Sequence, residues 1–317
     1  TYYTAFNTNM VVNEMFLESA TLRDNVVTIA KQLGYKPKSV VAPKATVSFQ
    51  VNFPQTYPAT IELKKGTGFV TSFDDKIYKF VTIEDYKAGV INGQAFFNNV
   101  EVYEGSLVTD TFTVDTTRAG QQFLLSNGSA DTSTIRTKVF PIETATEFAY
   151  YNQINNIVDI GASDGIFYVD ENLDEQYELF FGDGVIGKAL ENNNFIEVSY
   201  LVSSGSAANN ASVFTFSGVL TDKNGIAFPN NVTNITTVFP AQGGADIENI
   251  DSIKNNAPKL YATQNRAVTS NDYAAIVRKI YPAISDIITY GGEEERYPEF
   301  GKVKIVIKPN SGSTLST

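Results

Sequence analysis

From residue 45 onward the sequence alternates between apolar and polar residues, and this period of two dominates the middle of the chain. In the segment 46–53, TVSFQVNF, the apolar residues on one side of an extended chain are Val47, Phe49, Val51 and Phe53. Such alternation is typical of a strand with one buried and one exposed face, the usual pattern of antiparallel sheets. The chain is therefore expected to fold mainly into antiparallel β structure.

The alternating strands group into two predicted β blocks. The first block, 46–146, begins with the strand at 46–53. The short strands that follow it are separated by Gly, Asn and Asp turns and have the sequences TIELKK, GFVTSF, IYKFVTI, NVEVYEG, DTFTVD and TIRTKVF. This spacing favours a sandwich or barrel-like domain. A second β block is predicted over 147–244, with strands IFYVDE, QYELFFGDG and FIEVSYLV. Its last part, 213–240, contains Pro229 and an NNVTN cluster, so its register cannot be read.

The N-terminal segment, 1–45, shows helical periodicity instead. Thr21 and Asp24 are candidate caps for a helix whose apolar stripe is Leu22, Val26, Ile29, Ala30 and Leu33. Gly34 is expected to take the left-handed conformation that ends many helices, and Pro37 prevents continuation. A shorter helix is predicted over 11–19, VVNEMFLES. This lead-in is expected to pack on its own domain.

Helical periodicity returns in the C-terminal segment, 245–317. Thr269 precedes Asp272 by three residues, a helix-entry pattern related to the capping box. The following stripe comprises Tyr273, Ile276, Val277 and Ile280, and Pro282 is expected to end the helix. An alternating strand, GKVKIVIKP, follows at 301–309. The predicted fold class is α+β, mainly β: antiparallel β domains with N-terminal helices and a C-terminal α/β segment.

The sequence contains no Cys and no His. Without Cys there are no disulfides, thiolate metal sites or Cys nucleophile; without His the commonest metal ligand is missing. A Ser-His-Asp triad and His-based zinc sites are therefore impossible within this chain. We predict no enzyme activity, no cofactor and no metal, while chemistry that uses carboxylates alone stays open.

The charge balance argues against a nucleic-acid partner. The chain has 24 Lys and Arg against 35 Asp and Glu, a net charge of −11, and no basic cluster larger than Lys64-Lys65. A protein that grips phosphates needs a basic face. No run approaches the roughly 18 apolar residues of a membrane-spanning helix, so no membrane contact is predicted. Because the chain starts at Thr1 without an initiator Met and ends in NSGSTLST, it is expected to be a fragment of a longer protein.

The segment 182–187, GDGVIG, formally satisfies a dinucleotide-binding pattern through Gly182, Gly184 and Gly187. That interpretation requires a preceding strand, a following helix and an acidic residue about 20 positions later. The strand is present, but the gap before the next strand is too short for the helix, and the acid is missing. These glycines are therefore predicted to form a tight turn that needs backbone freedom.

A second formal pattern concerns calcium. Asp170, Asn172 and Asp174 occupy the first three ligand positions of an EF-hand loop. Glu175 stands where that loop needs Gly, and Phe181 stands where it needs a bidentate Glu. An acidic surface turn is favoured over a weak calcium site.

Two charged features have structural and functional interpretations. The run Glu293-Glu294-Glu295 contains carboxylates of the type a glycosidase uses, but a solvated loop between two strands is the simpler interpretation.

Arg266 stands just before the C-terminal helix. It is predicted to be a structural arginine that ties the loop to nearby carbonyls or an acid, because a phosphate site would want more positive neighbours.

Several of these stretches, taken in order, carry a family resemblance. They are LGYKP at 33–37, VYEG and FTVD near 102–115, FGDGVIGK at 181–188 and NRAVTSNDY at 265–273. Together they resemble baseplate J-like proteins, the wedge subunits of contractile phage tails. The wedge subunits of T-even phages resemble the chain most, and the chain would correspond to a C-terminal fragment of one.

The resemblance implies a structural part of the virion, assembled in the bacterial host cytoplasm. It implies a ring around the tail tube, built from copies of this chain and other baseplate wedge proteins, that passes on the signal for sheath contraction. Self-association, as a two-fold dimer or in ring contacts, is predicted through the stripe Tyr273, Ile276, Val277 and Ile280, although the same stripe fits an internal core. A receptor- or carbohydrate-binding tail module and a carboxylate-dependent hydrolase remain as alternatives.

Overall fold

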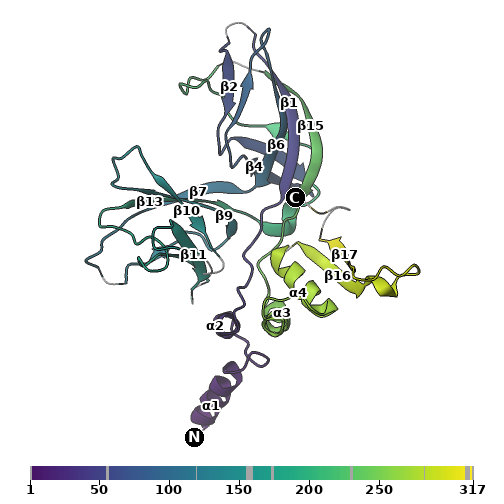
Figure 1. Ribbon diagram of the computed structural model, residues 1–317. Coiled ribbons are helices and arrows are strands. Elements are labelled where there is room, and N and C mark those ends of the chain that lie inside the picture. Colours follow the sequence, from purple (N-terminus) through teal and green to yellow (C-terminus); the bar gives the residue numbers. More distant parts are fainter. Residues whose placement is uncertain are drawn as a thin grey trace.

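A computed structural model describes residues 2–54, 57–118, 120–154, 160–172, 175–228, 231–281, 283–310 and 315. Strands predominate, most pairs are antiparallel, and helices lie at the N-terminus and near the C-terminus, which confirms the predicted α+β, mainly β class. Figure 1 shows two sheets that extend in different directions, with helices α1 and α2 below them and a C-terminal module beside them.

The first sheet has six strands in the order β14-β3-β4-β6-β1-β15. Their bounds are β1 Lys44–Asn52, β3 Gly68–Phe73, β4 Lys76–Val81, β6 Gln94–Glu104, β14 Thr215–Phe216 and β15 Asn231–Gln242. Strand β1 lies between β6 and β15 and is antiparallel to both. The six-stranded sheet therefore joins the early part of the chain to a strand almost two hundred residues later.

The alternation in β1 has the predicted consequence. Its residues Val47, Phe49 and Val51 are all buried in one core, and the ring of Phe49 lies 5.0 Å from that of Phe97 and 5.7 Å from that of Phe69 between centroids. Aromatic pairs at such distances add to the stability gained from area burial. Phe49 is thus central to the packing of the six-stranded sheet.

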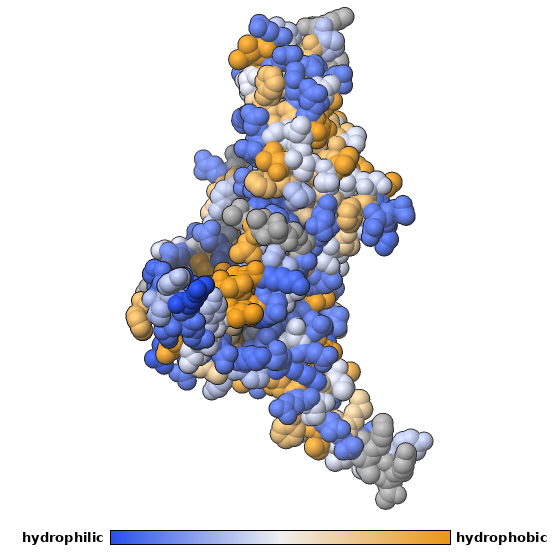
Figure 2. Space-filling model, turned by 90° about the vertical axis from the view of Figure 1, so that its right-hand side faces the viewer, coloured by the Kyte–Doolittle hydropathy of each residue, from blue (hydrophilic) through white to orange (hydrophobic). Residues whose placement is uncertain are grey.

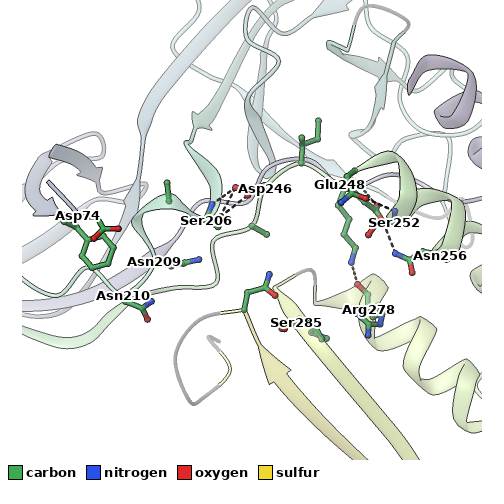
Figure 3. Close-up of a pocket in the computed structure, with 18 residues that line it drawn as sticks. Asp74, Ser206, Asn209, Asn210, Asp246, Glu248, Ser252, Asn256, Arg278 and Ser285 are labelled. Carbon is green, nitrogen blue, oxygen red and sulfur yellow. Dashed lines mark hydrogen bonds between the residues drawn. The ribbon is translucent and has the colours of Figure 1, made fainter. Parts of the chain in front are cut away.

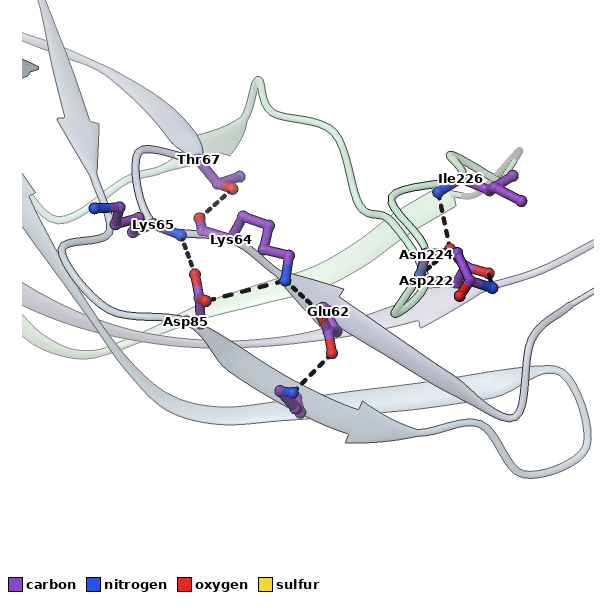
Figure 4. A network of polar contacts seen from close by, with 9 residues as sticks. Glu62, Lys64, Lys65, Thr67, Asp85, Asp222, Asn224 and Ile226 are labelled. Carbon is purple, nitrogen blue, oxygen red and sulfur yellow. Dashed lines mark hydrogen bonds and ion pairs between the residues drawn. The ribbon is translucent and has the colours of Figure 1, made fainter. Parts of the chain in front are cut away.

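A two-stranded ribbon, β2 (Thr60–Leu63) with β5 (Tyr86–Gly89), lies against this core. Glu62 of β2 is buried, and its carboxylate pairs with Lys64 and, at 2.8 Å, with Lys87 of β5 (Figure 4). The backbone of Glu62 also exchanges hydrogen bonds with Thr221, and Asp222 accepts the Ile226 N–H at 2.8 Å. The ribbon thereby fixes the returning loop 220–226.

The second sheet has seven strands in the order β7-β13-β9-β10-β11-β12-β8. Their bounds are β7 Ser106–Thr113, β8 Phe123–Leu124, β9 Ala130–Phe140, β10 Ala149–Gln153, β11 Ile166–Glu171, β12 Tyr177–Phe181 and β13 Phe195–Val202. The pair β10–β11 is parallel, and the other pairs are antiparallel. All seven strands come from one continuous stretch, 106–202.

The sheets do not follow the predicted segments 46–146 and 147–244. The boundary at 146/147 separates β9 from β10, which pair with each other, and β15 of the second segment pairs with β1 of the first. Strand pairing across long sequence separations leaves no mark on local periodicity, which explains the difference. Whether the segments 1–45, 46–146, 147–244 and 245–317 are independent units stays a prediction.

The N-terminal helices are α1 (Tyr2–Glu14) and α2 (Arg23–Gln32), and α2 packs on α3 (Ile250–Thr263) around Val26, Ala30, Ile253 and Leu260. The helix predicted over 11–19 in fact ends at Glu14. Gly34 follows α2 with φ +75°, as predicted.

The start of α2 differs from the prediction. Neither Thr21 nor Asp24 caps it, and its N-cap residue makes no side-chain cap bond. Instead, the Glu14 carboxylate accepts hydrogen bonds from the backbone N–H of Thr21 at 2.8 Å and of Leu22 at 3.2 Å. The cap comes from the end of α1, because a carboxylate is well suited to the positive N-terminus of a helix.

The C-terminal module consists of α4 (Ser270–Ile280), β16 (Ile284–Gly291), a short 3₁₀ turn η2 (Gly292–Glu294) and β17 (Val303–Pro309). A full capping box starts α4: Thr269 Oγ1 accepts from Asp272 N, and the Asp272 carboxylate accepts from Thr269 N at 2.8 Å. The strands form a hairpin that α4 covers on one side. Pro282, the predicted helix stop, lies outside the described residues.

Candidate functional site

The turn at 182–187 is built from backbone contacts, not as a ligand cradle. Gly184 and Gly187 have φ of +88° and +79°, the left-handed region that favours glycine. Gly182 has no positive φ, but a Cβ there would lie 2.4 Å from the carbonyl carbon of Gly187. The side chain of Asp183 accepts the N–H groups of Ile186 and Val185, which lower the pKa of its carboxyl. The next regular element is β13 at Phe195, so no helix follows to receive a pyrophosphate.

Changing Gly184 to Val is expected to destabilise the fold by more than about 1 kcal/mol, because a β-branched residue is strained at positive φ. Gly182→Val should cost at least as much through its clash with Gly187. Denaturant unfolding measures both. Gly89→Ala, at a site with open space and no positive φ, is the matched control. Unchanged stability of both valine variants would contradict this account of the turn.

A buried ion pair joins α2 to the seven-stranded sheet. Arg23 donates from Nε to one oxygen of Glu171 at 2.8 Å and from Nη2 to the other at 3.1 Å. Its Nη1 donates to the backbone carbonyl of Glu248 at 2.6 Å. One guanidinium therefore connects the N-terminal helices, the sheet that carries β11, and the segment that enters α3.

A second buried carboxylate lies beside it. Glu248 accepts from Tyr35 Oη at 2.6 Å, from Lys38 N at 3.1 Å and from Asn256 Nδ2 at 2.9 Å. Burial, reinforced by this carboxylate, raises the pKa of Tyr35 well above its ordinary value. Lys38 also donates from Nζ to the carbonyl of Arg278 in α4. The contacts between these elements are thus largely polar, and we call this region, centred on Arg23, Glu171 and Glu248, the polar junction.

A cleft of about 700 Å³ borders the polar junction (Figure 3). Its wall runs from Asp74 in the turn after β3, past Ser206 and Asp246, to Arg278 on α4 and Ser285 on β16. Most of its lining is polar. The six-stranded sheet and the C-terminal module therefore face each other across a polar gap and not across a packed apolar core.

Carboxylates also fix the places where the chain crosses between modules. Glu104, at the end of β6, accepts from Ser203 Oγ at 2.7 Å and from Ser204 N at 2.9 Å. Asp131 accepts the backbone N–H of Ala42 at 2.8 Å, and burial raises the pKa of its carboxyl. Each crossing is held by these hydrogen bonds together with a small buried apolar cluster of Ala42, Val81 and Leu201.

The predicted interface stripe lies on α4, and none of the helix is fully buried. Tyr273, Ile276 and Val277 are half-buried, whereas Ile280 is 75% exposed. The stripe is thus part internal packing and part surface. Its role in association stays a prediction.

The hairpin beside α4 exposes further apolar side chains. Ile288 and Val306 pair directly across β16 and β17 and are both exposed. The face in Figure 2 shows hydrophobic residues gathered at mid-height of the molecule, bordered by hydrophilic ones. Apolar surface of this kind, rimmed by polar residues, marks protein contact sites.

Arg266 is exposed on the loop before α4. Its Nη2 donates to the side chain of Gln264 at 3.1 Å, and it forms no ion pair with any residue that the structure describes. The predicted structural role rests on that one local bond and stays a prediction.

Of the carboxylates considered for calcium and for catalysis, Asp170 lies on β11, and Glu293 and Glu294 lie in the η2 turn of the hairpin. Asp170 pairs with Lys31 at 3.2 Å, and Asp174 lies outside the described residues. Glu293 and Glu294 are exposed at the end of the hairpin. Over the described ranges, no group of three or more Asp or Glu side chains is placed to hold a metal ion.

Chelator should therefore leave the thermal unfolding temperature of the purified chain unchanged. The expectation rests on the lack of His and Cys and on the pairing of Asp170 with Lys31. Melts with and without EDTA, together with elemental analysis, measure it. A stoichiometric metal, or a melting temperature lowered by several degrees, would be the contrary result.

Among the helices that the structure describes, none combines the length and apolar character needed to cross a bilayer.

Comparison with known proteins gives two informative matches. Residues 269–317 match a family described as baseplate structural protein gp6, C-terminal domain I. The chain is also 25% identical, over 329 aligned residues, to the baseplate wedge protein gp6 of Enterobacteria phage T4. That alignment covers 98% of this chain and 48% of the relative, so the chain spans about half the length of the protein it matches.

A solved structure, the cryo-EM structure of the anti-feeding prophage baseplate, aligns with 84% of this chain and 48% of its own at 14% identity. Its TM-score of 0.30 does not establish a common fold. The two sequence matches make the chain similar to a baseplate wedge protein, a structural component of a phage tail baseplate. The resemblance to baseplate J-like proteins stays a prediction.

Proposed function

We propose that the chain forms part of a wedge in a contractile-tail baseplate. There it contributes to the ring around the tail tube and transmits the conformational change that triggers sheath contraction and genome ejection. The observation that carries the proposal is the similarity to T4 gp6 along 98% of the chain. The stretches that resemble baseplate J-like proteins, among them the tight turn in FGDGVIGK, are consistent with the proposal.

The construction of the molecule suits the transmission of movement. Each sheet has its own apolar core, and a separate cluster holds α2 and α3 together. Between these cores lie the polar junction, the cleft of about 700 Å³ and one small apolar cluster, Ala42, Val81 and Leu201, where the two sheets meet. Rigid bodies joined by contacts of this small extent move by hinge rotation, because their cores resist continuous deformation.

The proposal is tested by co-expressing the chain with the neighbouring wedge proteins of the same phage. Stoichiometric co-purification, with wedge-shaped particles in electron micrographs, is the expected result. If the chain binds none of the wedge proteins, the proposed function is wrong.

Self-association is part of this proposal. A stable contact buries at least about 1,000 Å² in total, with apolar residues at its centre. The exposed Ile280 and its neighbours on α4 and the hairpin offer such residues, so a two-fold dimer is expected. Ile280→Glu should weaken the dimer measured by light scattering at tens of micromolar. Val213→Glu, an equally exposed site outside α4 and the hairpin, is the control. A dimer that survives Ile280→Glu would place the interface elsewhere.

One observation favours a second candidate, carbohydrate binding. On the seven-stranded sheet the rings of Phe148 and Tyr150 are exposed and lie 5.1 Å apart between centroids, and Lys138 lies over Phe148. Exposed rings on a sheet can stack on sugars. A glycan array separates the candidates, because a wedge protein with no receptor function gives no specific signal.

A further inference from the structure

A second pocket, of about 400 Å³, lies between the seven-stranded sheet, the segment after α2 and the end of α4. Four lysines line it: Lys31, Lys36, Lys38 and Lys279. Only two carboxylates, Asp170 and Glu171, share the lining, and Glu171 is already paired with Arg23. In a chain with a net charge of −11, this is a local concentration of positive charge. We call it the lysine pocket.

Two of these ammonium groups are only weakly held within the chain. Lys36 has neither a hydrogen-bond nor an ion-pair partner among the described residues, and Lys279 donates only to Asn265 Oδ1 at 3.4 Å. Loss of hydration lowers the pKa of Lys36; Asp170 opposes this effect and Lys31 adds to it. By contrast, Lys31 and Lys38 have close partners. Lys36 and Lys279 are therefore available to an anionic group from outside.

The end of the β16–β17 hairpin has the complementary character. Residues 292–300, which we call the hairpin tip, carry Glu293 and Glu294, both exposed and in no ion pair with a described residue. On the same tip Tyr297 and Phe300 are 79% and 82% exposed. Aromatic side chains are enriched at the centres of protein interfaces, so the tip combines negative charge with rings suited to a contact.

We propose that the hairpin tip of one copy of this chain docks into the lysine pocket of a second copy, with Glu293 and Glu294 facing Lys36 and Lys279. The inference rests on the proposed function as a repeated ring subunit. In this contact the aromatic rings cover the pocket rim and exclude water, which strengthens the ion pairs. It adds a head-to-tail contact to the two-fold contact proposed on α4.

The position of the tip favours a second copy over its own pocket. In Figure 1 the tip projects from the C-terminal module on the side away from the seven-stranded sheet, whose β9 and β11 border the pocket. A contact between two different surfaces is heterologous, and repeated heterologous contacts close into rings or extend into filaments. Two-fold and head-to-tail contacts used together link copies into a ring.

The first test uses a labelled peptide with the sequence of residues 290–300, YGGEEERYPEF, and the full 317-residue chain. Fluorescence anisotropy at low salt should show binding that falls at least tenfold in the variant Lys36→Glu/Lys279→Glu. The matched control Lys65→Glu/Lys76→Glu makes the same charge change at exposed sites outside the pocket. A peptide with both Glu293 and Glu294 changed to Gln should also bind at least tenfold more weakly. Equal binding by all chains and peptides overturns the proposal.

The second test exchanges the charges. Association of the chain, measured by sedimentation, should weaken in Lys36→Glu/Lys279→Glu and in Glu293→Lys/Glu294→Lys. A mixture of the two variants should associate again, because one complementary pair is restored. Failure of the mixture to associate contradicts the docking.

A binding measurement with inorganic phosphate tests whether the lysine pocket is a general anion site. If phosphate binds with the same lysine dependence while the peptide does not bind, the pocket is an anion site and the docking is wrong. These results are separate from the test of the proposed function. Co-purification with wedge proteins in the absence of peptide binding rejects only the docking, whereas peptide binding without co-purification rejects only the wedge role.

Discussion

Replacing Arg23 with Met should destabilise the protein by about 3 to 5 kcal/mol, because it breaks a buried ion pair and leaves its carboxylate unpaired. The side chains of Arg23 and Glu171 are only 12% and 5% exposed. Without the guanidinium, the Glu171 carboxylate stays buried without its bidentate partner, and the Glu248 carbonyl loses a donor at 2.6 Å. Chemical denaturation followed by circular dichroism measures the loss.

Two controls identify the cause. The double variant Arg23→Met/Glu171→Met should recover most of the stability, because an apolar pair replaces a buried ion pair at little or no net cost. Lys302→Met, which breaks the exposed pair with Glu299, should cost no more than about 1 kcal/mol. If Arg23→Met costs no more than Lys302→Met, the pair does not hold the modules together.

Phe49→Ala is expected to cost about 3 to 5 kcal/mol, through lost burial and the cavity left behind. Phe49 is 3% exposed, and its ring contacts those of Phe69, Phe97 and Phe216. Because β1 lies between β6 and β15, loosening this site weakens the only strand that pairs with both of them among the described residues. Urea unfolding gives the free energy change.

The control for this variant is Phe96→Ala on the neighbouring strand. Phe96 and Phe97 are adjacent in β6, but Phe96 points to the other face and is exposed. Its removal should change stability by less than about 1 kcal/mol. If the two variants lose similar amounts of stability, the alternation of buried and exposed positions does not determine which side chains stabilise the sheet.

The local features of the fold were readable from the sequence. Alternation in 46–53 identified the buried face of β1, and Gly34 after α2 has the expected left-handed conformation. The spacing of Thr269 and Asp272 indicated the start of α4, where the structure shows a reciprocal capping box. Each of these depends on residues only a few positions apart, so a single sequence contains the whole signal.

Long-range pairing was not readable. The pairing of β1 with β15 brings together residues such as Val47 and Thr237. Nothing in the sequence of either segment indicates which strand it pairs with. Strand β15 also hides its own pattern, because Asn234 has φ +51° and Pro240 lies within the strand. Bulges and edge prolines of this kind disrupt alternation while they discourage further pairing at the edge. Helix α3 was missed as well, although Asn249 caps its start by accepting the Ser252 N–H at 2.8 Å; Pro258 lies inside this helix.

The candidate site was only partly predictable. The α4 stripe and the turn glycines follow from local pattern, although the reason at Gly182 is space and not backbone conformation. The polar junction was invisible, because Arg23 and Glu171 are separated by 148 positions and neither belongs to a motif. The lysine pocket likewise gathers Lys36 and Lys279 from opposite ends of the chain.

The order of strands has a consequence for how the protein is made. The seven-stranded sheet lies within 106–202, whereas the six-stranded sheet waits for β15 at 231–242. During synthesis on the ribosome, the seven-stranded sheet is therefore the first that can be completed, although β1 of the six-stranded sheet is made earlier. Once it has folded, the Glu104 contacts with Ser203 and Ser204 hold its two ends side by side. The flexible chain between β1 and β15 is then much shorter than their separation in sequence. The conformational entropy lost when these two strands pair is therefore smaller.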